Sequence, residues 1–409
     1  MPDPTDALGR FLAGERDREV AFLAELVRAP SDNPPGDCAP HAERTALLLE
    51  ALGLTVERHP VPEARVRANG MISATNLVVR ERFGEDGPVI ALNAHGDVVP
   101  PGEGWTQDPY GAAIVDGWMY GRGVAVSKSD IASYTWALLA LRASGLPLRG
   151  AVELHITYDE EAGGEIGPGL LLAEGSSKPD YAIGAGFSYA VVNAHNGALH
   201  LEVEVRGRSA HAAKPATGID ALEAATVILH QLYAWRRTLG DRVSAVPGIG
   251  SPQLTIGLIN GGINTNVVPD RVTFRLDRRL TPEEQGGEVE AELRQVIEDA
   301  ARSFPEARVS IRRILLAEPL TPLPGSETLS DALRAEAGRI MGEPVETSGV
   351  PLYTDARHYA AHGIPIVLYG AGPHSIEEAN AHRADERLPL ADLFKATEVV
   401  ARALARLLG

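Results

Sequence analysis

The sequence predicts an α/β fold, in which a mostly parallel sheet is flanked by helices and a smaller α+β domain is inserted. Strand-length apolar runs alternate with amphipathic segments of helical spacing, as is typical of a sheet with helical crossovers. Two of these runs end directly in charged clusters, at 95–97 and at 159–161. From about 199 to 313 the order changes to β-α-β-β-α-β, the order of a ferredoxin-like sandwich.

The individual elements follow from residue spacing and from turn residues. Apolar residues at helical spacing predict helices at 6–28, 41–52, 128–141, 220–236, 284–303 and 327–340, and a last one from 390. β-branched and alternating apolar runs predict strands at 55–57, 76–80, 89–94, 151–158, 199–205, 254–259, 272–277 and 366–369. We therefore expect a first domain in two parts, 1–198 and 316–409, and a second domain at 199–315.

Composition narrows the class of protein. The net charge is −17, from 38 basic and 55 acidic residues, which argues against a nucleic-acid partner and against an anionic membrane surface. Cys38 is the only cysteine, so an intrachain disulfide and a cysteine-based metal site are excluded. The stretch from Met1 to Asp6 does not resemble a signal peptide, and no apolar run approaches the roughly 18 residues of a membrane span. We expect a cytoplasmic protein with neither a membrane nor a nucleic-acid partner.

Polar side chains follow two of the predicted strands. His95 and Asp97 come directly after the strand at 89–94, and Asp159, Glu160 and Glu161 follow the strand at 151–158. Chemistry collects at the carboxyl ends of strands in open α/β sheets, so both clusters are candidate site residues. An imidazole beside a carboxylate suits a metal ligand, and adjacent carboxylates suit a cation or a general base. The structural alternatives are a core histidine and a solvated acidic turn.

A glycine-rich turn precedes the longest apolar helix. Gly121-Arg122-Gly123 allows the backbone to approach a site closely before that helix begins. The remaining glycines of a dinucleotide-binding fingerprint are absent, so we exclude a Rossmann cofactor site.

These features together resemble the co-catalytic zinc peptidase and deacylase family that includes carboxypeptidase G, acetylornithine deacetylase, succinyl-diaminopimelate desuccinylase and aminoacylase. The similarity covers nearly the whole chain, in order, although each motif by itself has low specificity. The matched segments are His95-Gly96-Asp97, Gly121-Arg122-Gly123, Asp159-Glu160-Glu161, Gly207-Arg208-Ser209-Ala210-His211, Asn266-Val267-Val268-Pro269-Asp270, Asp277-Arg278-Arg279, Thr354-Asp355-Ala356-Arg357, and His382 with Glu386.

The resemblance implies a catalytic domain that holds two metal ions and an inserted lid at 199–315 that also forms a homodimer. It implies that His95, Glu161 and His382 ligate metal and that Asp97 orients the metal-bound His95. Glu160 would be the general base that activates water. Imidazole and carboxylate ligands suit zinc, as one or two ions, and are equally compatible with manganese or cobalt.

The resemblance further implies substrate contacts in the inserted domain. His211 would reach the site of the partner subunit and stabilise the tetrahedral oxyanion. Asn266 and Arg279 would hold a substrate carboxylate, for which arginine is a bidentate partner, and Thr354 would also bind substrate. Each also has a structural interpretation: His211 as a polar residue at a strand edge, and Arg279 as one charge of the pair with Arg278.

The chain departs from the family pattern at two positions. The resemblance calls for an aspartate that bridges both metals where this chain has Val126, and for an acidic ligand of the His95 metal where it has Gly186. Three interpretations remain open. In the first, a single metal ion remains. In the second, nearby side chains replace the lost metal ligands, the candidates being Asp130, His374, Glu165 and Asp97. In the third, both metal ions are lost and the protein binds a small molecule without hydrolysing it.

We expect a metal-dependent hydrolase that cleaves the amide bond of a small acylated amino acid or dipeptide. Metal would polarise the carbonyl group while Glu160 takes a proton from water. The main alternative is a non-catalytic family member that binds a small ligand in the cleft between its domains. Metal-free hydrolysis led by Ser127-Lys128 is a third hypothesis, and we disfavour it because the family uses these positions mainly for structure.

Overall fold

The computed structural model describes residues 6–409 of the chain, in two compact units. Unit 1 comprises 6–193, 322–348 and 354–409, and unit 2 comprises 194–321 and 349–353. The residues on which the expectation of no signal peptide rests lie almost wholly outside this range. Within 6–409, no helix combines the length and the apolar character that crossing a bilayer requires.

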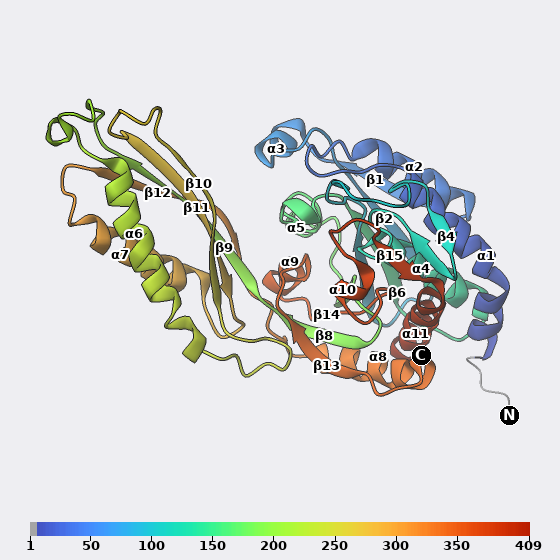
Figure 1. The fold of residues 1–409 in the computed structure, drawn as a ribbon. Coiled ribbons are helices and arrows are strands. Elements are labelled where there is room, and N and C mark those ends of the chain that lie inside the picture. The colour runs from blue at the N-terminus through green and yellow to red at the C-terminus, as the bar shows by residue number, and fades with distance from the viewer. Residues whose placement is uncertain (1–5) are drawn as a thin grey trace. The chain divides into compact units, whose positions relative to one another are not determined.

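The described part of the chain forms an eight-stranded sheet whose central strands run parallel (Figure 1). Strands β6, β3, β7 and β14 pair in parallel, and β1, β2 and β8 pair antiparallel at the flanks. The order is β1 (Val56–Pro60), β2 (Thr75–Arg82), β6 (Ala151–Thr157), β3 (Val89–His95), β7 (Tyr181–Gly184), β14 (Ile366–Leu368), β8 (Ala190–His195) and β13 (Glu346–Val350). The predicted α/β fold with a mostly parallel sheet is confirmed.

The register of the parallel strands brings three chain segments to one edge of this sheet. His95 at the end of β3 pairs with Thr157 at the end of β6, and Asn93 pairs with Gly184 at the end of β7. The residues that follow these strands therefore leave the sheet side by side. Both charged clusters of the sequence lie at this edge, as expected for a site in an open α/β sheet.

Helices cover the sheet of unit 1. The long buried helix α4 (Lys128–Ser144) packs on β3 and β6 and against α1 (Asp6–Arg28) and α11 (Leu390–Leu408). It ends at Gly145, whose φ of +66° is the left-handed conformation of a helix C-cap. The remaining helices of the unit are α2 (Ala39–Ala51), α3 (Glu63–Ala68), α5 (Pro168–Ala173), α8 (Ser326–Met341), α9 (Ala356–Ala361) and α10 (Ile376–Ala379).

Unit 2 is a four-stranded antiparallel sheet with two helices on one face (Figure 1). Its chain order is β9 (Gly197–Arg206), α6 (Ala221–Arg236), β10 (Gln253–Gly261), β11 (Arg271–Leu280), α7 (Gly286–Ala301) and β12 (Arg308–Ala317). The spatial order β10-β11-β9-β12 is that of a ferredoxin-like sandwich. Helix α6 begins at Asp220, whose carboxylate accepts N–H bonds from Leu222 and Glu223.

A third sheet, of three strands, was not predicted from the sequence. It consists of β15 (Arg387–Pro389), β5 (Trp118–Tyr120) and β4 (Ala113–Val115). Each strand has only three residues, too few to show a period, and β15 pairs with β5 from the far end of the chain. This pairing matters for the site because β15 directly follows the loop that carries His382.

Glu19 gives the fold a pH dependence that can be measured. Its buried carboxyl accepts a hydrogen bond from the Thr397 hydroxyl (2.6 Å), and burial raises its pKa to about 8. Between about pH 4.5 and pH 8 the unfolded chain ionises this group and the folded chain does not, so stability falls as pH rises. We expect E19Q to be more stable than wild type by about 2–4 kcal/mol at pH 8 and equally stable at pH 4.5.

Urea unfolding of wild type and E19Q at both pH values measures this difference. The exposed Glu103 provides the control, because E103Q should change stability equally little at pH 4.5 and pH 8. An advantage of E19Q that does not change with pH would contradict the assignment.

Candidate active site

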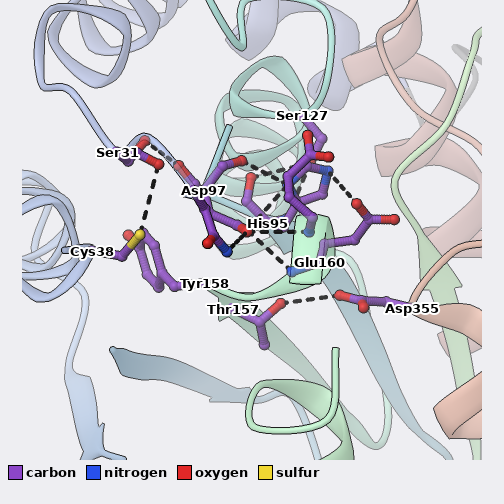
Figure 2. A network of polar contacts seen from close by, with 12 residues as sticks. Ser31, Cys38, His95, Asp97, Ser127, Thr157, Tyr158, Glu160 and Asp355 are labelled. Carbon is purple, nitrogen blue, oxygen red and sulfur yellow. Dashed lines mark hydrogen bonds and ion pairs between the residues drawn. The ribbon is translucent and has the colours of Figure 1, made fainter. Parts of the chain in front are cut away.

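His95 is the last residue of β3 and is held from several sides (Figure 2). Its Nδ1 lies 2.9 Å from the carbonyl oxygen of Asp97 and 3.4 Å from Asp97 Oδ1. Its backbone N–H donates to Ser127 Oγ (3.0 Å), which fixes the strand end to the start of α4. The contacts at Nδ1 leave Nε2 directed at Glu160, whose Oε2 lies 3.9 Å away. This is the arrangement of an imidazole ligand oriented through its other nitrogen.

The glycine between His95 and Asp97 is required by packing. A Cβ atom on Gly96 would lie 2.4 Å from Cε1 of Tyr158, a contact that a real side chain cannot make. Tyr158 is itself buried and follows β6, so the two strand exits pack directly against each other. The His-Gly-Asp sequence therefore allows the segment after β3 to contact the segment after β6.

Asp97 organises the acidic turn. Its two carboxylate oxygens accept the backbone N–H groups of Glu160 and Glu161, each at 3.2 Å. The side-chain amide of Asn33 donates a third bond to it at 3.0 Å. Asp97 therefore positions His95 and the Glu160–Glu161 turn at the same time. The turn is a short 3₁₀ segment, Glu160–Ala162.

The Glu160 carboxyl lies in a strongly acidic, buried environment. Burial raises its pKa well above the ordinary value, and Glu161, Asp355 and Asp97 add to this effect, while His95 opposes it. Burial alone would lower the pKa of His95, but the carboxylates of Glu160, Asp97 and Glu161 raise it well above its usual range. A carboxyl whose pKa is shifted upward is suited to accept a proton during catalysis.

His382 meets Glu161 at the other side of the acidic turn. Its Nε2 lies 3.3 Å from Glu161 Oε1, and the hydrogen bond to Glu161 raises the pKa of His382. His382 has a φ of +61°, and its neighbours Asn380 and Asp385 are also left-handed. A non-glycine residue in this conformation is held there by its surroundings, and such strain concentrates at functional sites.

A buried ion pair anchors the loop that carries His382. Glu386 Oε2 accepts a bond from Arg122 Nη1 at 2.7 Å, and both side chains are only 1% exposed. Glu386 Oε1 accepts the backbone N–H groups of Ala125 (3.0 Å) and Val126 (3.3 Å). Arg122 donates further to the carbonyl groups of Pro101 and Arg383. The Gly-Arg-Gly turn is therefore bound to the loop that carries His382.

Two further buried carboxyls lie beside the acidic turn. Asp355 accepts a hydrogen bond from Thr157 at Oδ2 (3.3 Å), and burial raises its pKa to about 7 (Figure 2). Asp159 accepts the N–H of Ile166 (2.7 Å), and burial together with Asp355 raises its pKa well above the ordinary value. The Oδ1 atom of each lacks a hydrogen-bond partner in the structure.

The candidate residues of the inserted domain belong to unit 2. His211 is exposed, and its Nδ1 accepts the N–H of Ala213 at 3.0 Å. The carbonyl of the exposed Asn266 accepts the N–H of Ala212. Arg279 is partly exposed and bonds Asp277, whereas the adjacent Arg278 is fully buried on Glu284. Only Arg279 of this pair is accessible to a ligand.

Thr354 belongs to unit 1. Its Oγ1 accepts the N–H of Ala356 at 3.2 Å, at the start of α9. Its place just before Asp355 brings it to the same segment as one of the buried carboxyls. The assignments of Thr354, His211, Asn266 and Arg279 to substrate or oxyanion stay predictions.

Sequence reasoning missed three residues that support the site. Asn33 lies in a segment predicted only as a loop, and Asp355 was noted as part of a motif without a role. Ser127 entered only as a candidate for metal-free catalysis, but its buried Oγ bonds the backbone of His95. All three act through contacts across more than 30 residues of sequence, which local spacing does not reveal.

Carboxylate and histidine side chains thus gather at the edge of the α/β sheet, at the ends of β3 and β6. Residues 91–406 match the family model of peptidase family M20/M25/M40. The chain therefore belongs to this family. The sequence motifs had already indicated a resemblance to it.

Individual relatives agree with this assignment. The chain is 30% identical to a succinyl-diaminopimelate desuccinylase of Gluconacetobacter diazotrophicus, over 95% of this chain and 97% of the relative. It is 29% identical to an acetylornithine deacetylase of Proteus mirabilis, over 93% of this chain and 94% of the relative. A dinuclear metal-binding M20 peptidase of Bacillus subtilis has the same fold, with a TM-score of 0.69 and 20% identity over 97% of this chain and 99% of that one.

The side chains of residues 6–409 do not fit a pair of metal ions. Within residues 6–409, no three His, Cys, Asp or Glu side chains are grouped as ligands of one ion. Glu161 and His382 are the closest match, because their 3.3 Å separation is that of two ligands on one ion.

Proposed function

We propose that this protein hydrolyses the amide bond of a small N-acylated amino acid or dipeptide, with Glu160 as the general base. The observation that carries the proposal is the position of the Glu160 carboxyl. It is held at the edge of the sheet by Asp97, faces Nε2 of His95, and has a pKa that burial raises well above the ordinary value. Family membership supports the reaction class.

The reaction consumes one water molecule. Glu160 takes a proton from water as the oxygen attacks the carbonyl carbon, and the tetrahedral intermediate then breaks its C–N bond. Glu160 returns the proton to the leaving nitrogen, which gives a carboxylic acid and an amine. Asp97 holds the backbone of Glu160 and orients His95, so its contribution is positional.

We further propose that Glu161 and His382 would hold a divalent metal ion. The resemblance implies His95 as a further ligand, but its Nε2 faces Glu160, and within residues 6–409 the three side chains are not grouped around one ion. Such an ion would supply Lewis-acid polarisation of the scissile carbonyl group. Zinc, manganese and cobalt all suit imidazole and carboxylate ligands.

The remaining roles are proposed from the family resemblance. Asn266 and Arg279 hold the substrate carboxylate, Thr354 also binds substrate, and His211 of the partner subunit stabilises the oxyanion. The partly exposed side chain of Arg279 supports its role. Its guanidinium group contacts one carboxylate oxygen of Asp277, Oδ2, and lies over the ring of Tyr353. Cytoplasmic localisation stays a prediction from the sequence.

Amine release from a panel of N-succinyl, N-acetyl and dipeptide substrates tests the function. We expect release from at least one class of substrate in the presence of Zn²⁺, Mn²⁺ or Co²⁺, and none after a chelator removes the ion. No release from any substrate with any ion would favour a protein that binds a ligand without hydrolysing it.

We propose a homodimer through strand β10 of unit 2. This edge strand exposes Leu258 (60%) and Ile259 (56%), and Ile263 just beyond it is 77% exposed. The opposite edge, β12, instead carries exposed arginines. Edge strands are normally protected by charge, so the apolar edge is the one that a second copy would cover by strand addition.

Substitution of this edge tests the dimer. We expect L258E/I259E to convert a dimer into a monomer in sedimentation velocity, because burying two carboxylates at an interface is strongly unfavourable. The control I114E alters an equally exposed residue of unit 1 and should remain dimeric. A monomeric wild type, or a double variant that stays dimeric, would contradict the proposal.

A further inference from the structure

We propose that each subunit binds one divalent cation, at Glu161 and His382, and has no place for a second one beside His95. The inference rests on the proposed function, since it concerns the same site. A single ion would distinguish this chain from the dinuclear metal-binding peptidase of Bacillus subtilis. The single ion follows from the donor atoms of the site, because other contacts already occupy several of them.

The geometry of the Glu161–His382 pair supports the single ion. Zinc binds nitrogen and oxygen ligands at about 2.0–2.2 Å in a tetrahedral arrangement, which places two ligands about 3.3–3.5 Å apart. The distance between His382 Nε2 and Glu161 Oε1 is 3.3 Å. The 3₁₀ turn holds Glu161, and the Arg122–Glu386 pair anchors the loop of His382, so both ligands are positioned in advance.

Beside His95, few donor atoms remain for a second ion. Nδ1 of His95 faces the carbonyl of Asp97, and both carboxylate oxygens of Asp97 accept backbone or amide N–H bonds. Glu160 faces Nε2 of His95, with Oε2 at 3.9 Å. An ion there would have an imidazole and the general base as ligands. Asp355 also lies near His95, but its Oδ2 accepts a bond from Thr157 and its Oδ1 is packed against Gly164, where a Cβ atom would lie 2.1 Å from it.

Positions 126 and 186 cannot supply the missing ligands. The Val126 side chain packs against the apolar core of unit 1, and its N–H is bound to Glu386. A Cβ atom on Gly186 would lie 3.1 Å from the backbone nitrogen of Tyr369 and 3.2 Å from the carbonyl carbon of Leu368. A side chain at this position would press on the neighbouring strand β14.

Asp130 does not replace the missing metal ligands. Its buried carboxylate accepts the N–H of Ala371 (2.7 Å) and a bond from the backbone of Gly186. A Cβ atom on Gly370 would lie 1.8 Å from Asp130 Oδ1, so the carboxylate is packed into the backbone after β14. Asp130 therefore ties together the ends of β7 and β14.

The other two candidates for substitution are also bound elsewhere. His374 contacts Glu343 (3.4 Å) and Glu378 (3.3 Å) and stacks on Tyr189. Glu165 pairs with Arg357 at 3.1 Å. Both side chains are thus engaged in contacts with residues other than His95 or Glu160.

Metal content measured by equilibrium dialysis against Zn²⁺, followed by elemental analysis and native mass spectrometry, tests the inference on the intact protein. We expect one zinc per subunit in wild type and none in E161Q or H382A. The matched controls D130N, D355N and H374A are expected to keep one. Circular dichroism of each variant shows that a lost ion does not reflect a lost fold.

Two zinc ions per subunit in wild type, none in wild type, or loss of the ion in D130N or D355N would each overturn the inference. The measurement needs no substrate, so its failure is separate from that of the proposed function. A protein with one ion that releases no amine would contradict the function alone. A protein with two ions that releases amine would contradict the inference alone.

Discussion

E160Q is expected to lower kcat for amide hydrolysis by about 10²–10⁴-fold while the protein stays folded. Glutamine keeps the shape of the side chain and cannot accept the proton of water. The backbone N–H of residue 160 still donates to Asp97, so the turn that holds Glu161 should be unchanged. Steady-state amine release from the best substrate of the panel measures the effect.

The prediction separates the enzyme from a binding protein. In E160Q, calorimetry should give an unchanged affinity for the amino-acid product, since binding does not need the base. The exposed Glu174 offers the matched control, because E174Q makes the same chemical change away from the site and should retain wild-type kcat. Equal turnover by E160Q and wild type would remove Glu160 from the mechanism.

E386Q is expected to lower the free energy of unfolding by about 3–5 kcal/mol, the usual cost of breaking a buried ion pair from one side. The substitution leaves the Arg122 guanidinium charged at 1% exposure without its carboxylate. The backbone contacts of Arg122 to Pro101 and Arg383 and its position over the Trp105 ring offset only part of this loss. Urea unfolding at neutral pH measures the difference.

The exposed pair Arg67–Glu63 provides the control for this second prediction. Its side chains are 75% and 73% exposed, so E63Q should change stability by less than about 0.5 kcal/mol. A comparable loss in E63Q, or no loss in E386Q, would show that burial does not determine the contribution of the ion pair. A folded E386Q that loses its zinc would show in addition that the pair positions His382.

Much of the architecture was accessible from the sequence, because it is encoded by local periodicity. The alternation of apolar runs and amphipathic segments predicted the parallel sheet, and the β-α-β-β-α-β order predicted the fold of unit 2. The small sheet of β4, β5 and β15 was missed, since strands of three residues carry no period. The bounds of unit 2, 194–321 with 349–353, also depend on contacts that join distant segments.

The sequence by itself determined the family and the side chains available for catalysis, because Glu160, Glu161 and His95 stand directly at strand ends where spacing identifies them. Only the tertiary structure decided which of these donor atoms are committed to other contacts. Asp97 reaches the acidic turn from a distant segment and is itself held by Asn33. The Asp130 carboxylate accepts backbone N–H groups of Ala371 and Gly186. The physical reason is that residue types follow from local sequence, whereas the partners of a buried carboxylate follow from long-range packing.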